Sequence, residues 1–219
     1  MWDTKSAWEE SRNRPQCNQW LVCPESPDLR HPQVSIKGPA YDIDFQRWSA
    51  PFIMEAINAR VVLRSNMLLG MAYGDDFLYR EQMITGKGFK GRLSAIGLTA
   101  GLGLFAVTVI INPLRAFMQR FVLPKPGEGP SPEAQLAGHF DVSLLGKNED
   151  GKTLKVRVTG DRDPGYGCTA KMLAQASLCL AFDVTQEQCE GGFWTPATAM
   201  GGQLTDRLTQ HAGMTFTVD

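Results

Sequence analysis

The chain has 219 residues, enough for one large domain or two small ones. Hydrophobic residues make up 43% of it and charged residues 21%, which is ordinary for a globular protein and allows a sizeable core. The formal net charge of -1 lacks the basic excess that nucleic-acid-binding proteins normally carry, so we expect no nucleic-acid partner.

Residues 1–40 are expected to form an irregular N-terminal arm, because prolines interrupt any helical or strand periodicity in this segment. The first thirty residues are polar and contain no apolar core of a secretory signal, so we do not expect secretion. Five scattered cysteines do not suggest a disulfide framework. The combination nearest to a metal site is Cys17, Cys23 and His31. It has an uncommon spacing and no fourth ligand, so no metal is expected.

One or two helices are predicted over residues 51–70. Ser49 is the expected cap and Pro51 lies in the expected first turn, where a missing N–H does no harm. Apolar residues then recur at roughly helical spacing. Glycines mark a loop after this helix, and the segment from Tyr73 to Met83 is predicted to be a strand.

The segment from Leu93 to Leu114 carries no charge, and Arg92 and Arg115 flank it. About 20 helical residues cross a bilayer core, so this length predicts membrane contact, as a single span or as a shallow monotopic insertion. Pro113 is expected to end or kink the helix. A buried core helix of a soluble protein is the alternative. The expected lipid-facing residues are Leu98, Leu102, Leu104, Phe105, Val107, Val109 and Ile110.

A proline-rich linker is expected at residues 123–132, and Ser131 is expected to cap a short helix after it. Residues 139–145 and 153–159 both alternate between apolar and polar side chains. Asp150-Gly151 supplies a tight turn between them, so we predict a half-buried antiparallel hairpin. In its second strand, Leu154 is expected to face the core together with Val156 and Val158.

The remaining elements are a helix from Thr169 to Phe182, a final helix over residues 198–211 and a last strand over 214–218. The helix from Thr169 is apolar on most faces and is expected to be buried on several sides. Gly213 fits the end of the final helix. The predicted fold class is α+β, with a mixed or antiparallel sheet, packed helices and one long apolar helix. The expected segments are 1–40, 41–92, 93–122, 123–132 and 133–219.

Two groups of residues are candidates for binding. The first lies in the loop 160–167, which joins a strand to a helix, a place where ligands often bind. The loop has neither the glycine fingerprint of a dinucleotide site nor the G-K-[ST] end of a phosphate loop. The alternative is a tight loop whose charges satisfy one another and the helix start. The candidates are Asp161, Arg162, Asp163, Tyr166 and, on the following helix, Lys171.

The second group lies on the predicted helix 51–70. Two of its arginines stand four residues apart, on one face, where two guanidinium groups can clamp a carboxylate or phosphate. A solvated face, or pairing with Glu55, is the alternative. The candidates are Asn58, Arg60, Arg64, Ser65 and Asn66. No catalytic residue is assigned, because the histidines have no matching nucleophile nearby in the sequence.

Several motifs stand in the order found in saccharopine dehydrogenase-like oxidoreductases. They are APF-x-M-x-x-IN-x-RVV-x-RSN-x-LLG at 50–70, YG-x-DF-x-YRE at 73–81, LPKPGEGPSP at 123–132, GDRDPGYG-x-TAKML at 160–173, GG-x-x-TPA-x-AMG at 191–201 and AGMTF at 212–216. Over roughly residues 41–217 the chain therefore resembles the C-terminal region of this family, which includes trans-acting enoyl reductases. The resemblance implies that residues 41–92 begin an α/β substrate-type domain.

The resemblance also implies an N-terminal Rossmann domain that binds NADP(H), membrane or lipid-body association, and a lipid-linked acyl substrate. No early strand–glycine-loop–helix is present in residues 1–50, so this chain is expected to lack the Rossmann domain and to bind no cofactor alone. A fragment, a short form or one half of a split enzyme is expected, with membrane lipid, a separate Rossmann-domain half or a second copy as partners. The alternatives are a catalytically dead membrane-bound scaffold and a non-functional fragment.

Overall fold

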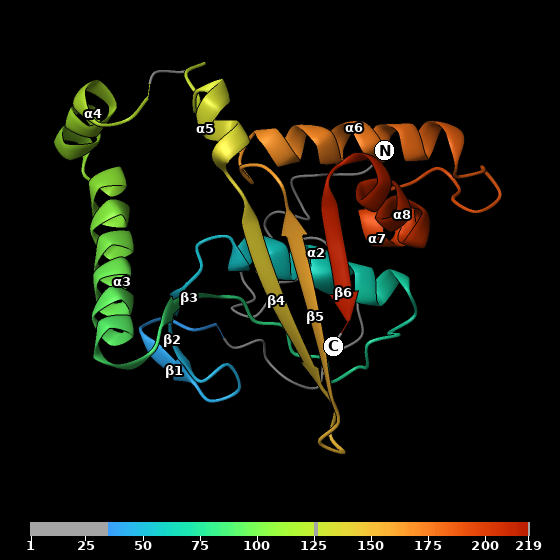
Figure 1. The fold of residues 1–219 in the computed structure, drawn as a ribbon, viewed down its shortest axis with the longest axis horizontal. Helices are drawn as coiled ribbons and strands as arrows, with labels where there is room; N and C mark the ends of the chain where they lie inside the picture. Colours follow the sequence, from blue (N-terminus) through green and yellow to red (C-terminus); the bar gives the residue numbers. More distant parts are fainter. Residues whose placement is uncertain (1–34, 125–126, 219) are drawn as a thin grey trace, which may run out of the picture. The chain divides into compact units, whose positions relative to one another are not determined.

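The computed structural model describes residues 35–124 and 127–218 (Figure 1). The chain divides into two compact units, Met1–Leu123 and Pro124–Asp219. Each unit contains helices and one three-stranded sheet whose pairings are all antiparallel. The described chain is therefore α+β, which confirms the predicted fold class.

The sheet of the first unit has the strand order β1-β2-β3. Its strands are β1 (Ala40–Asp42), β2 (Arg47–Pro51) and β3 (Gln82–Gly86). Ser49 and Ala50 are fully buried in β2, and the Ser49 hydroxyl donates to the Gln82 side-chain oxygen at 2.7 Å. The predicted role of Ser49 as a helix cap is wrong. The strand predicted over 73–83 occurs later in the chain, as β3.

Helix α2 (Glu55–Leu68) follows β2, so the body of the predicted helix 51–70 is confirmed and its first turn is not. After α2 the chain makes a tight turn, in which Met71 and Gly74 both have positive φ, at 62° and 100°. Asn66 holds this turn. Its side-chain amide donates to the Gly74 carbonyl at 2.8 Å, and its side-chain oxygen accepts from the Tyr73 N–H at 2.7 Å.

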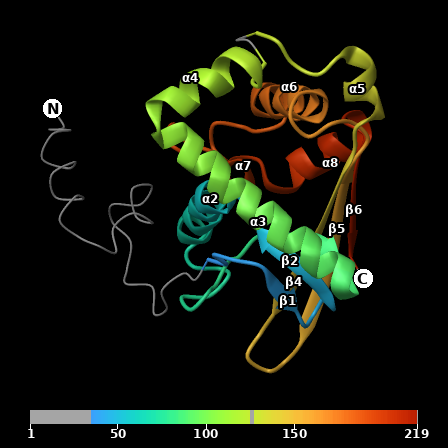
Figure 2. The same cartoon turned by 90° about the vertical axis from the view of Figure 1, so that its left-hand side faces the viewer.

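Two further helices, α3 (Gly88–Ile110) and α4 (Asn112–Phe121), follow in the described part of the first unit. The N-terminal end of α3 packs on β2 and β3, with Gly91 and Ala95 buried (Figure 2). A Cβ at Gly91 would lie 2.4 Å from the Gly86 backbone, so only glycine permits this approach. The helix breaks at Ile111, whose backbone is extended, and Pro113 lies in the first turn of α4.

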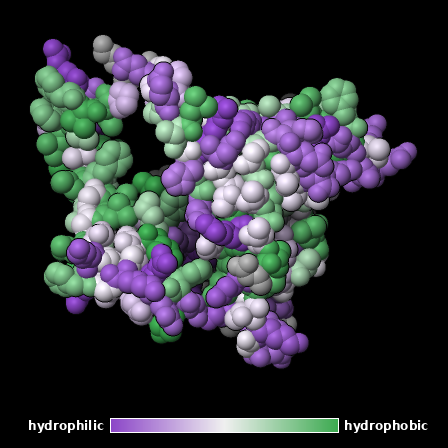
Figure 3. All heavy atoms as spheres, viewed as in Figure 1, coloured by the Kyte–Doolittle hydropathy of each residue, from purple (hydrophilic) through white to green (hydrophobic). Residues whose placement is uncertain are grey.

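Helix α3 is long and apolar enough to cross a membrane by length and composition. Core helices of soluble proteins and signal sequences pass the same test. Only 6% of the apolar window of α3 is buried. Apolar side chains gather over α3 and α4 on the face drawn in Figure 3.

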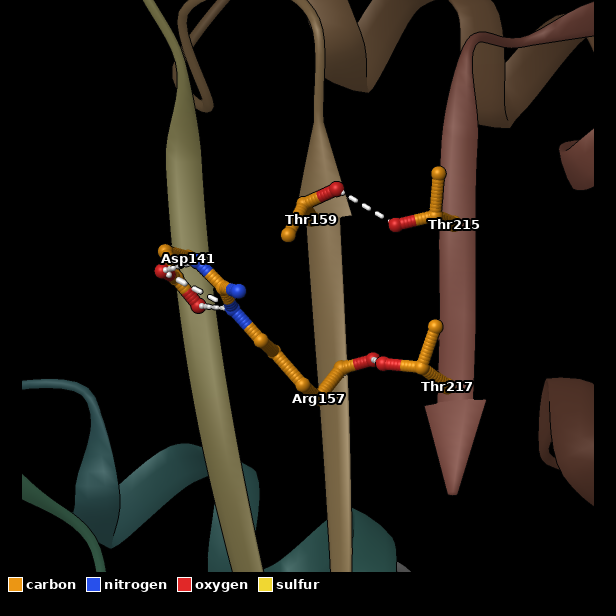
Figure 4. A network of polar contacts seen from close by, with 5 residues as sticks. All are labelled: Asp141, Arg157, Thr159, Thr215 and Thr217. Carbon is orange, nitrogen blue, oxygen red and sulfur yellow. Dashed lines mark hydrogen bonds and ion pairs between the residues drawn. The ribbon is translucent and has the colours of Figure 1, made fainter. Parts of the chain in front are cut away.

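The sheet of the second unit has the order β4-β5-β6, from β4 (Phe140–Lys147), β5 (Thr153–Gly160) and β6 (Met214–Val218). The predicted hairpin is confirmed, with Gly151 at a φ of 78° in its turn. One face of the sheet carries Arg157, which donates to both oxygens of Asp141, and Thr159, which shares a 2.6 Å hydrogen bond with Thr215 (Figure 4).

The opposite face of this sheet meets the core of the second unit. The core contains Cys168, Leu208, Ala212 and Met214, with Val158 and Phe216 packed against it. The burial expected for Leu154 is wrong, because this side chain lies near the turn, beyond the helices, and is 54% exposed. A Cβ at Gly160 would lie 2.1 Å from the ring of Phe140, which crosses the strand there.

Four helices belong to the second unit: α5 (Pro132–Ala137), α6 (Gly167–Phe182), α7 (Pro196–Ala199) and α8 (Gly201–His211). The Ser131 side chain caps α5 as predicted. The predicted final helix is split into α7 and α8 at Gly201, which has a φ of 48°. In α6 only Cys168 and Cys179 are buried, so burial on several sides is wrong.

Candidate functional site

The loop between β5 and α6 is organised by the side chain of Asp163. Its carboxylate accepts hydrogen bonds from the backbone N–H groups of Gly165, Tyr166 and Gly167, at 3.0, 3.0 and 2.6 Å. These bonds, led by the one from Gly167, hold the pKa of the Asp163 carboxyl below its usual value. Asp163 therefore satisfies the Gly167 N–H at the start of α6 and two N–H groups of the loop before it. This agrees with the alternative interpretation of the loop only for the helix start, because Asp161 pairs with Lys171 and not with Arg162.

Asp161 and Lys171 form an ion pair across the start of α6. The Lys171 ammonium donates to both Asp161 oxygens, at 2.8 and 2.9 Å, and to the Ala212 carbonyl at 3.2 Å. Gly213 lies directly beside Asp161, where a Cβ would be 2.3 Å from its carboxylate. Lys171 is thus a structural cation that joins α6 to the end of α8. The Asp161 side chain is 48% exposed and that of Lys171 is 27% exposed.

Arg162 and Tyr166 are the members of this group that remain available. Within the described ranges, Arg162 makes no hydrogen bond or ion pair and is partly exposed. Tyr166 is 56% exposed, and its ring lies against Gly129, where a Cβ would stand 3.3 Å from Cζ. The loop therefore brings one guanidinium and one phenol to the surface of the second unit.

Two residues of the α2 group have structural roles. Asn66 is 1% exposed and both ends of its amide are used by the turn at 71–74. Ser65 is 4% exposed, and its hydroxyl donates to the Val61 carbonyl within the helix at 2.9 Å. Burial leaves neither side chain open to a ligand of appreciable size.

Asn58 belongs to a carboxylate cluster that the sequence did not single out. Its amide donates to both oxygens of Glu81, at 3.1 and 2.9 Å, and the Tyr79 hydroxyl also donates to Glu81. The Glu81 N–H in turn donates to the carboxylate of Glu55, a buried residue, at 3.2 Å. Burial, followed by the bond to Glu81, raises the pKa of Tyr79 above its usual range, so the phenol stays a donor.

This cluster fastens the N-terminal part of α2 to the segment that leads into β3. Its members lie 26 residues apart along the chain, between Glu55 and Glu81. The only signal for this cluster in the sequence was the motif YG-x-DF-x-YRE at 73–81, which ends at Glu81. The sequence did not indicate which residue would hydrogen-bond to this glutamate. Of the original α2 candidates, Arg60 and Arg64 stand one turn apart and are both partly exposed.

A surface depression in the second unit also went unnoticed in the sequence. It is lined by Asp183, Gln203, Asp206, Arg207, Gln210 and His211. Arg207 donates to both oxygens of Asp183, and this contact lowers the pKa of that carboxyl. Because the two charges satisfy each other, the depression offers an exposed histidine and amides but no free cation–anion pair.

The loop 160–167 does not fit a nucleotide phosphate. A phosphate at a helix N-terminus is held by free backbone N–H groups. Here the Asp163 carboxylate occupies the Gly167 N–H at the start of α6 and the two N–H groups before it, and it would repel a phosphate placed beside it. In the described parts of the chain, no group of three or more His, Cys, Asp or Glu side chains could hold a metal ion. The combination Cys17, Cys23 and His31 lies outside those parts.

Curated relatives of the chain are bacterial trans-acting enoyl reductases. A provisionally named trans-acting enoyl reductase of Mycobacterium tuberculosis is 37% identical over 163 residues, which is 74% of this chain. Proteins named trans-acting enoyl reductase from Mycobacterium ulcerans and Mycobacterium bovis are 34% and 35% identical over 167 residues. The chain spans 39% of the length of each of these relatives.

No family model and no solved structure matches the chain. The chain is nevertheless homologous to trans-acting enoyl reductases over 74% of its length. The match is 163 residues long, which is too long to lie wholly before α3 or wholly after it. The matched region therefore includes residues on both sides of α3.

Proposed function

We propose that this chain forms the substrate-side part of an oxidoreductase of the enoyl reductase type. The observation that carries the proposal is the 34–37% identity to trans-acting enoyl reductases over 74% of the chain. An enoyl reductase adds a hydride and a proton across a carbon–carbon double bond conjugated to a carbonyl group. The saccharopine dehydrogenase-like motifs at 123–132 and 160–173 point to the same wider class.

The hydride donor, NADP(H), is held in this proposal by a nucleotide-binding part that corresponds to the relatives' unmatched length. The β5–α6 turn supports that division of labour, because its backbone donors are used by Asp163. A separate polypeptide or a longer form of this chain could supply that part. On its own, the chain is then inactive as a reductase.

The residues we favour for substrate binding are Arg60 in the first unit and, separately, Arg162 and Tyr166 in the second unit. Each is a charged or polar side chain that is exposed or partly exposed, and Arg60 and Arg162 have no internal partner among the described residues. Guanidinium groups bind carboxylates and phosphates, such as the phosphate of an acyl carrier or the headgroup end of a lipid-linked acyl chain. A membrane-associated enzyme with a lipid-linked acyl substrate is consistent with the low burial of α3.

A chimera tests the proposed function directly. The matched 39% of the Mycobacterium ulcerans trans-acting enoyl reductase is replaced by this chain, and loss of NADPH absorbance is followed with an α,β-unsaturated acyl thioester. We expect turnover by the chimera and none by this chain alone. A chimera that folds by circular dichroism and binds NADPH, yet reduces no enoyl thioester, would overturn the proposal.

A further inference from the structure

Helix α3 has two faces that differ in what covers them. As far as Leu102, the residues on one face recur at positions i, i+4, i+7, i+8 and i+11, and all are buried or partly buried; beyond Leu102 the same side is exposed, with Phe105 and Val109 at 41% and 47%. The buried or partly buried residues are Gly91, Ala95, Leu98, Thr99 and Leu102. The opposite face is an exposed apolar ridge along the whole helix, formed by Phe89, Leu93, Ile96, Leu104 and Val107. Phe89, Leu93 and Leu104 are 78%, 59% and 65% exposed.

Helix α4 continues this apolar surface and is strongly amphipathic. Leu114, Phe117 and Phe121 follow the i, i+3, i+7 spacing of one helix face and are 41%, 56% and 67% exposed. Arg115 and Arg120 lie on the rest of the helix surface, and Arg120 stacks on the ring of Phe121 at 5.7 Å. No residue of α4 is buried. This is the pattern of a helix that lies in a membrane interface.

The charges around the ridge all have one sign. Between Lys87 and Gly127 the sequence contains basic residues and no Asp or Glu. Lys90 and Arg92 flank the start of the ridge and are exposed, while Arg115 and Arg120 stand at its far end. Each Lys or Arg near an anionic bilayer surface contributes about 1 kcal/mol of attraction, which is about a fivefold gain in binding. The surface therefore complements anionic headgroups around an apolar centre.

The geometry of α3 disfavours a single crossing. Its first turns, as far as Ala95, are built into the sheet, and the rest of the helix is roughly 22 Å long at about 1.5 Å per residue. The hydrocarbon core is about 30 Å thick.

We propose that α3 and α4 lie in the plane of a bilayer containing anionic phospholipid. The ridge of α3 and the Leu114–Phe117–Phe121 face of α4 enter one leaflet, and the flanking Lys and Arg side chains contact the headgroups. The inference rests on the membrane association in the proposed function, not on its reductase activity. The protein is then monotopic, with the sheet β1–β3 and the second unit on one side of the membrane.

Vesicle co-sedimentation tests the surface. The full chain is mixed with phosphatidylcholine vesicles, with or without phosphatidylglycerol. We expect stronger binding to the anionic vesicles, which weakens with salt. Phe117→Glu/Phe121→Glu should abolish binding, and Arg115→Glu/Arg120→Glu should weaken it at least about fivefold per reversed charge. The matched controls are Ile43→Glu, an 80% exposed residue outside the surface, and Arg80→Glu, which should bind like the unaltered chain.

Sidedness is tested in cells by labelling single cysteines with an impermeant maleimide. Reporters at Ile43 and Lys152 are placed in a background in which Cys17, Cys23 and Cys189 are serine. In-plane binding predicts that both reporters label on the same side. Labelling on opposite sides would overturn the proposal in favour of a crossing. Equal binding to neutral and anionic vesicles, or no binding to either, would overturn it as well, while the chimera assay would still decide the reductase function.

Discussion

Asp163 is the residue whose charge matters most to the local structure of the β5–α6 loop. Replacing it by alanine removes the acceptor for three backbone N–H groups, and we expect a lower melting temperature at neutral pH. Asp163→Asn keeps an acceptor oxygen, so it is expected to lower the melting temperature less than Asp163→Ala does. Equal melting of all three proteins by circular dichroism would contradict this role.

The same carboxylate predicts a pH dependence. The folded pKa of Asp163 lies below its ordinary value of 3.8, so the folded state favours the ionised form. Its stabilisation is therefore fully present above the ordinary pKa and is lost as the pH falls through the lowered folded pKa. We expect the melting temperature of Asp163→Asn to fall less steeply below about pH 4 than that of the unaltered chain. Parallel curves for the two proteins would show that other carboxylates dominate.

Asn66 and Arg60 separate a structural residue from a binding candidate within one helix. Asn66→Ala leaves the Tyr73 N–H and the Gly74 carbonyl without their partner, which costs about 1–3 kcal/mol of unfolding free energy. Arg60→Ala should change stability by less than about 0.5 kcal/mol, because the side chain is partly exposed. In the chimera, Arg60→Ala should instead raise KM. Urea unfolding and steady-state kinetics measure the two effects.

At the residue scale, the sequence identified polar side chains worth attention but could not assign their roles. Asn66, Asn58 and Lys171 were all candidates for binding. Each has a hydrogen-bond partner in its own unit, and the partner of Asn58, Glu81, lies 23 residues away along the chain. The spacing of residues along a helix shows which of them share one face. It does not show which group from a distant part of the chain that face contacts.

Among the elements, α3 offers a paired glycine test of its docking on the sheet. Gly91→Ala places a methyl group 2.4 Å from the Gly86 backbone and should cost more than about 1 kcal/mol of stability. Gly97→Ala meets nothing within 4 Å and should stabilise the helix by up to about 1 kcal/mol. Thermal melts in detergent or with lipid compare the two variants. If Gly91→Ala were as stable as Gly97→Ala, the buried contact with β3 would be refuted.

Sequence patterns predicted long elements well and short ones badly. The strands of the β4–β5 hairpin and helix α6 are each eight residues long or more. The alternation of apolar and polar residues therefore predicted the strands, and the apolar run predicted the helix. Strand β2 has five residues and ends at Pro51, and Ser49 with Pro51 imitates a helix start. Its strand character comes from pairing with β1 and β3, which lie before and well after it in the chain. No local period encodes that pairing.

For the whole molecule, the apolar content of a helix did not predict its burial. In α6, Leu173, Leu180 and Phe182 are 68%, 50% and 77% exposed, although the helix carries a single charge, Lys171. The sequence indicated correctly that this helix avoids charge. It could not show which faces would be covered, because burial depends on how many elements pack around the helix. Here the buried face is the one turned toward α8 and the sheet.

The second unit should fold without the residues that precede it. Its sheet consists of β4, β5 and β6 only, and its core residues, from Cys168 to Met214, all lie after Pro124. We therefore expect residues 124–219 expressed alone to melt in one cooperative transition by calorimetry and to show near-ultraviolet dichroism. Gly160→Val is the matched control, since its side chain would collide with the Phe140 ring and should abolish that transition. A fragment with native-like secondary structure and no cooperative melting would mean that this core is completed by residues before Pro124, because the sheet and helices would be present without fixed packing.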